Sequence, residues 1–408
     1  MNTSFSYRSR RSKGLFSRLN TPAKAVISLL TGAALIAAFV GLFVVPASWG
    51  SDNPQRSGRY SVQVGQTILE KYCPGRMQLA DTGSFGDNAF SVSEGDSKGQ
   101  TRTAAFGSVY SSDLSALQSD QEQSANDTDL TDTSNAVMQG QSANEQGLLS
   151  TVQMLSTDEG EGSAAATVSW ATKGDLQGMS ATSCVVPQLE QSMMTAPTTT
   201  GWTQQLILAN SSDKATTVSI QAWGTKTGQP VALETDSSVS VNAHAERIVN
   251  LSAAAPDQQA LYVTLTSSAT PVAAVTRVVH MDGLTPRGSD FAVSGSEASK
   301  TVSLTGIVSG AQTDVSVFSK QSGTVTLSWI TRSGIKKARS LRLIGQQINA
   351  LSLGKAPTDA YGIVVDGDVK LDASARCTQS SGKQSDFLIV NSVPSFQAQY
   401  PDMPPIMA

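Results

Sequence analysis

The chain has 408 residues, of which only 15% are charged, and its formal net charge is −4 at pH 7. Proteins that bind nucleic acid usually carry a strong positive charge, so we expect no nucleic-acid partner. The length suits two or three domains, and a composition rich in Ser, Thr, Ala, Gly and Val is typical of β-domains with short turns.

A basic leader, residues 1–24, precedes an uncharged apolar segment, Ala25–Val45. As a helix this segment is roughly 32 Å long, close to the ~30 Å hydrocarbon core of a bilayer. The leader holds six Lys and Arg residues, and the next basic residue is Arg56, an asymmetry that predicts a cytoplasmic N-terminus. We therefore expect one N-terminal transmembrane α-helix in the lipid bilayer, and a single-pass protein of the cell membrane with its C-terminal domains extracytoplasmic. A signal peptide cleaved after Ala47 is the alternative, although the apolar core of a signal peptide is usually shorter.

A polar tether, residues 46–58, leads to a first β-domain predicted over residues 59–190. Within it, residues 111–147 carry seven carboxylates and no Lys or Arg. Polar stretches whose charges are all of one sign do not bury enough apolar surface to fold, so this part is predicted to be an acidic disordered insertion.

Short strands separated by turn residues continue at intervals of about 8–12 residues, which is typical of β-sandwiches. They predict a second unit over residues 200–285 and a third over residues 300–395, followed by a tail, residues 396–408. The third unit repeats the second, because Thr324–Trp329 matches Thr217–Trp223 and a glycine turn follows each. We expect an all-β ectodomain of tandem Ig-like β-sandwich units.

The three cysteines of an exported chain permit one disulfide and leave one thiol over. Cys73 and Cys184 flank the body of the first domain and are the candidate pair, which would close a loop of about 110 residues. Three reduced thiols packed as small apolar side chains are the alternative.

The chain has two histidines, His244 and His280, and neither has a second candidate ligand at a recognised spacing. Glycine-rich phosphate loops and the nucleophile-elbow motif are absent from the sequence. We therefore expect no catalytic residue, no cofactor and no metal, and a protein that is not an enzyme. One alternative is a hydrolase in which one of the histidines joins a serine and a carboxylate only in space.

The tryptophans of the exported region raise a second alternative, a surface adhesin or carbohydrate-binding module, because an exposed aromatic row stacks on sugar rings. Trp223 and Trp329 fall at equivalent repeat positions, which favours a shared core position instead. The four side chains concerned are Trp170, Trp202, Trp223 and Trp329.

Several short motifs carry a resemblance to a known family. They are Cys73-Pro74-Gly75, Gly174–Met179 leading to Cys184, Leu206–Ser211, and Pro271–Val275. With these motifs the layout resembles a family of uncharacterised actinobacterial single-pass envelope proteins with β-rich extracytoplasmic repeats, although Ser211 stands where many members have proline.

The resemblance brings no catalytic residues, and such proteins tend to be encoded near envelope glycosyltransferases. It implies a membrane-anchored, extracytoplasmic, non-enzymatic scaffold or binding protein of the cell envelope, associated with envelope polysaccharide or glycosyltransferase machinery. The partner implied is an envelope protein or a cell-wall glycan.

Overall fold

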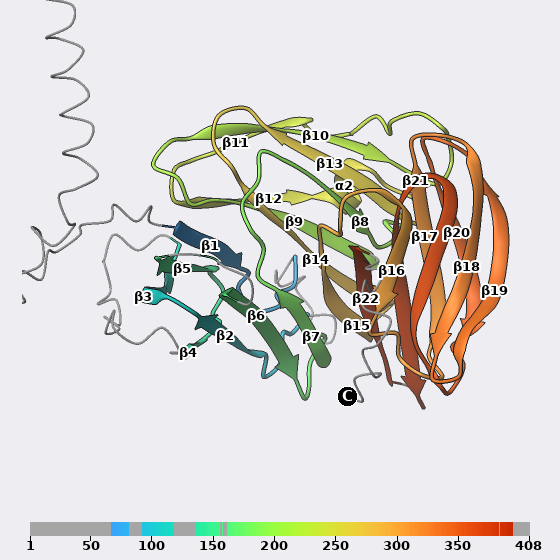
Figure 1. Ribbon diagram of the computed structural model, residues 1–408, viewed down its shortest axis with the longest axis horizontal. Coiled ribbons are helices and arrows are strands. Elements are labelled where there is room, and N and C mark those ends of the chain that lie inside the picture. The colour runs from blue at the N-terminus through green and yellow to red at the C-terminus, as the bar shows by residue number, and fades with distance from the viewer. Residues whose placement is uncertain are drawn as a thin grey trace, which may run out of the picture. The chain divides into compact units, whose positions relative to one another are not determined.

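The computed structural model describes residues 67–80, 92–117, 136–155, 157, 161–382 and 384–394. All of them belong to one compact unit, Val64–Ala408, and they are mainly β-strands (Figure 1). In this described part, no helix is both long enough and apolar enough to cross a bilayer. The leader, Ala25–Val45, the tether and the tail lie outside the described residues.

The first β-domain, called the first repeat below, forms two antiparallel sheets, in the orders β1-β5-β3 and β4-β2-β6-β7. Its strands are β1 (Thr67–Cys73), β2 (Lys98–Phe106), β3 (Val109–Ala116), β4 (Ala136–Ser142), β5 (Leu148–Met154), β6 (Gly162–Ala171) and β7 (Gly178–Ser183).

The prediction of an acidic disordered insertion over residues 111–147 is wrong toward both ends of this range, where the strands β3 and β4 lie. Leu114 on β3 is buried beside the cysteines. The alternation of buried and more exposed side chains around it allows a strand to form although the composition of this part is polar. Residues 118–135, between these strands, lie outside the described part.

The second repeat again forms two sheets, β11-β10-β13-β8 and β12-β9-β14-β15. It begins before the expected residue 200 and extends beyond residue 285. Its elements are β8 (Glu190–Thr195), β9 (Trp202–Asn210), β10 (Thr216–Trp223), β11 (Ser238–Val241), β12 (Ala245–Asn250), α2 (Leu251–Ala254), β13 (Leu261–Ser267), β14 (Ala273–Asp282) and β15 (Thr285–Val293).

The third repeat has the same strand order, except that the long strand β21 replaces both β13 and β14 and so joins the two sheets into one. Its first half pairs with β16 and β18, and its second half pairs with β17 and β22. The strands are β16 (Ser299–Thr305), β17 (Gln312–Ser319), β18 (Gly323–Thr331), β19 (Gly334–Leu343), β20 (Gln347–Lys355), β21 (Ala360–Ser381) and β22 (Gln384–Pro394).

The expectation of tandem Ig-like sandwiches is wrong. In an immunoglobulin sandwich the first strand shares a sheet with the second, fifth and fourth strands. In the second repeat the first strand, β8, pairs with the sixth, β13, while the seventh, β14, pairs with the second, β9. Strand spacing predicts the number of strands but not this order, because non-local pairing determines it.

The repeats also do not fold as separate domains, because their sheets pack against one another. The sheet β12-β9-β14-β15 packs one face on β11-β10-β13-β8 through Leu206 and Leu208, and its other face on the first repeat through Ile207 and Ala209. Alternate residues of β9 therefore enter two different cores, and each repeat depends on its neighbour for burial.

A central junction joins the three repeats, because β15 lies against β7, β8 and β22 (Figure 1). Each of the four larger sheets contributes one of these strands, an arrangement like that of a four-bladed β-propeller.

At this junction the buried carboxylate of Asp290, on β15, links the other two repeats. It accepts hydrogen bonds from the amides of Ile389 on β22 (2.6 Å) and Ala181 on β7 (3.3 Å). Asp386, also on β22, accepts one from the amide of Met179 (3.1 Å). Burial raises the pKa of Asp290 to about 7, although these donors oppose the shift, and burial also raises the pKa of Asp386.

The predicted disulfide is confirmed: Cys73 at the end of β1 is bonded to Cys184, immediately after β7. Both are buried, with Leu114 and Leu148 around them, while Cys377 is buried and free. The bond therefore ties the first strand of the first repeat to its last.

Removing the disulfide with C73A/C184A should lower the free energy of unfolding, by about 4–5 kcal/mol in the chain-entropy model for so long a loop. Urea denaturation of both proteins measures the difference. Reductant should lower the midpoint of the wild type and leave that of C73A/C184A unchanged. An equal response to reductant in both proteins would contradict the prediction.

The junction also predicts a pH dependence of stability. Asp290 titrates near pH 7 when folded and near pH 4 when unfolded, so the folded protein holds more protons between these values. The free energy of unfolding should therefore fall as pH rises from about 4 to 7. D290N should flatten this slope in chemical denaturation series, and the exposed-site control D236N should keep it. An unchanged slope in D290N would show that Asp290 does not titrate in this range.

Candidate functional site

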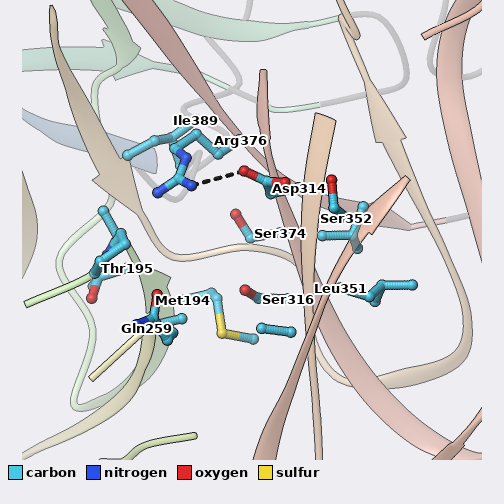
Figure 2. Close-up of a pocket in the computed structure, with 15 residues that line it drawn as sticks. Met194, Thr195, Gln259, Asp314, Ser316, Leu351, Ser352, Ser374, Arg376 and Ile389 are labelled. Atoms are coloured by element: carbon cyan, nitrogen blue, oxygen red, sulfur yellow. Dashed lines mark hydrogen bonds and ion pairs between the residues drawn. The ribbon is translucent and has the colours of Figure 1, made fainter. Parts of the chain in front are cut away.

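A cleft of about 340 Å³ opens between the second and third repeats (Figure 2). Its volume lies at the lower end of the range for small-ligand sites. One wall is the end of β8 with the segment that follows it, and the other is formed by β17, β20, β21 and β22. The side chains labelled in Figure 2 are Met194, Thr195, Gln259, Asp314, Ser316, Leu351, Ser352, Ser374, Arg376 and Ile389.

Arg376 on β21 is the positive charge of this cleft. Its Nη2 lies 2.8 Å from Oδ2 of Asp314 on the paired strand β17, because the register places the two residues opposite each other. Its guanidinium lies over the ring of Trp202, 4.8 Å from the ring centroid. The side chain is 25% exposed, so the ion pair and the aromatic ring hold it in place while it still reaches solvent.

The hydroxyl groups of the cleft differ in how far they are already satisfied. Ser374 donates to the carbonyl of Val390 (3.0 Å), and Ser352 accepts from Gln312 (2.7 Å). Thr195 is 4% exposed, and its Oγ1 has no hydrogen-bond partner among the described residues. Because buried polar atoms normally have a partner, this hydroxyl is the unsatisfied polar group of the cleft wall.

A larger hollow of about 1040 Å³ lies where all three repeats meet. Gln177 belongs to the first repeat, Thr285 to the second, and Lys355 and Ser380 to the third, with Asp386 also in the wall. Many of its lining residues carry hydroxyl or amide groups, so this hollow offers hydrogen bonds alongside apolar surface.

The histidines occupy separate places. His244 Nε2 lies 2.7 Å from Oδ1 of Asp213, in an exposed turn. His280 stacks on Trp202, with ring centroids 4.0 Å apart, and burial, followed by the charge of Arg376, lowers its pKa. Within the described part, neither ring forms a hydrogen bond with a serine, so the spatially assembled triad is not present there.

The tryptophans do not form an exposed row. Trp329 is buried in the core of the third repeat, Trp223 packs against Tyr262 and Phe318, and Trp202 lies beneath Arg376. Trp170, 37% exposed, lines a separate groove with Arg76.

Sequence reasoning did not identify Arg376, Asp314 or Thr195. One signal was available: Arg376 is the one basic residue in Leu371–Thr378, a strand segment made mainly of small side chains. A charge at an otherwise buried strand position indicates a partner or a site. Its partner, Asp314, is 62 positions away, so only the fold brings the two together.

Comparisons with curated proteins and with solved structures found no match to this chain. A family model does match, over residues 137–401, which is more than half of the chain and runs from within β4 to beyond the end of β22. The family is described as a family of unknown function (DUF5719), which agrees with the expected membership of an uncharacterised family. The chain therefore belongs to this family, DUF5719.

Proposed function

We propose that the protein is a non-enzymatic binding or scaffold protein of the cell envelope, and that the cleft around Arg376 receives its partner. The observation that carries the proposal is a guanidinium held in place in a cleft whose wall also includes the buried Thr195, whose hydroxyl has no partner among the described residues. Both groups lie on the wall of one cleft, but on different repeats.

The chemistry of the cleft suits a polar, hydroxyl-rich partner. Asp314 offsets the charge of Arg376, so the pair presents donors and acceptors without a large net charge. Met194 and Ile389 add apolar surface beside them. A sugar, with hydroxyls on its edge and an apolar ring face, matches this combination, and so does a polar peptide segment of an envelope protein.

The proposed location outside the cytoplasm, at the cell membrane, has two supports. The basic leader before Ala25–Val45 follows the charge asymmetry of exported proteins. Structural disulfides such as Cys73–Cys184 persist in oxidising compartments. A link to envelope glycosyltransferases rests on the family resemblance.

The test is photo-crosslinking in intact cells from a probe placed at Ser352, followed by identification of the attached molecule. An envelope protein or glycan should be recovered, and R376L should reduce its yield about tenfold, because a charged hydrogen bond contributes on the order of 1.5–3 kcal/mol. R247L, at an exposed arginine of β12, is the matched control. Equal yields from wild type and R376L would refute the role of the cleft.

A carbohydrate-binding module is a second candidate, favoured by the groove at Trp170. There the half-exposed indole lies with Arg76, Gln100 and Asn144, which combine a stacking surface with hydrogen-bonding groups.

For this candidate, W170A should weaken binding of cell-wall oligosaccharides by about tenfold in calorimetric titrations, since covering a large apolar side chain contributes on the order of 1.5–3 kcal/mol. W170F should retain most of the affinity because it keeps a ring. If W170A binds as well as the wild type, the groove is not a sugar site.

A further inference from the structure

We propose that the outer face of the hairpin β18–β19 binds a linear polyanion, a chain polymer that carries an anionic group in each repeating unit. This surface is separate from the Arg376 cleft and goes beyond the proposed function.

The charge distribution of the third repeat points to an anionic partner. From Val315 to Thr358 the chain has seven Lys and Arg residues and no Asp or Glu, although the whole protein is acidic. Four of the seven lie on β19, namely Lys336, Lys337, Arg339 and Arg342, and all four are exposed.

The pairing register divides these four residues between two faces. Lys336 pairs with Trp329 and Arg339 with Leu327, both buried, so these two share the inner face. Each has a partner there: Lys336 forms an ion pair with Asp359 (3.3 Å), and Arg339 donates to the carbonyl of Ser352 (3.5 Å).

Lys337 and Arg342 share the outer face instead. Lys337 pairs with Ser328 and Arg342 with Thr324, while the hydroxyls of Ser340 and Thr326 bond to each other between them (2.9 Å). Neither cation forms an ion pair with another described residue. The outer face of the hairpin is therefore a strip of hydroxyls with an unpaired cation toward each end. On the neighbouring strand β21, Asp366 borders this strip opposite Thr326, and its carboxylate accepts a hydrogen bond from Thr301 (2.5 Å).

The position of the strip also suits an extended partner. Among the described strands β19 pairs only with β18, so its other edge is open. Lys337 and Arg342 are separated by roughly 15 Å along a strand with a bulge. A flexible chain with a charge in every repeating unit places anions at both ends of such a strip, whereas a single small anion reaches only one.

Charged residues on edge strands also prevent edge-to-edge aggregation, a role that any Lys or Arg on the edge fulfils. That role requires charge but no anionic ligand, so binding affinity distinguishes it from the proposal.

The experiment titrates the full-length protein with long-chain polyphosphate and with polygalacturonate, against uncharged dextran, at several salt concentrations. We expect binding to one or both polyanions and not to dextran. K337Q/R342Q should weaken polyanion binding about tenfold. It should also make the slope of the logarithm of the binding constant against the logarithm of the salt concentration shallower by about 1–2, since each ionic contact releases roughly one counterion.

Two further variants separate the proposal from its alternatives. K173Q/K214Q removes two exposed lysines from the other repeats and should leave binding unchanged. R376L should also leave it unchanged, so failure of the cleft and failure of this strip are distinguishable. Unaltered binding by K337Q/R342Q, an equal loss in K173Q/K214Q, or stronger binding to phosphatidylglycerol vesicles than to either polymer would overturn the proposal.

Discussion

The arrangement of the molecule depends on the buried carboxylate of Asp290. An ionisable group with 1% exposure is costly unless its lone pairs are used, and here backbone amides of the first and third repeats use them. A strand of the second repeat is thereby fixed against a strand of each neighbour. Apolar packing alone holds sheets together without fixing which strand meets which, whereas these directional bonds select one register.

Burial on both faces of the sheets also requires the repeats to pack against one another. In the second repeat, β9 contributes Leu206 to one core and Ile207 to another. A sandwich that stood alone would present that second face to water. The repeats therefore fold into one compact unit, Val64–Ala408, and the clefts lie where the repeats pack against one another.

The surfaces proposed for binding follow from this arrangement in different ways. The Arg376 cleft exists only because two repeats meet, since Thr195 comes from one and Asp314 from the other. The strip on β18–β19 belongs to a single repeat and lies on a hairpin with an open edge. A partner that contacts the cleft is sensitive to how the repeats are packed, and a partner that contacts the strip is not.

The sequence by itself determined the all-β character, most strand positions and the repetition of the second unit in the third, because alternation, turn residues and spacing are local signals. It also named Cys73 and Cys184 as the candidate disulfide, but only the structure excluded reduced thiols at these positions. It misplaced the ends of the segment 111–147, where composition outweighed the alternation around Leu114. The basic stretch from Val315 to Thr358 was visible in the sequence, but which of its charges face outward depended on the register of β18 with β19. Only the tertiary structure decided the strand order, the junction at Asp290 and the pairing of Arg376 with Asp314, because these contacts join residues far apart in the chain and no local pattern encodes them.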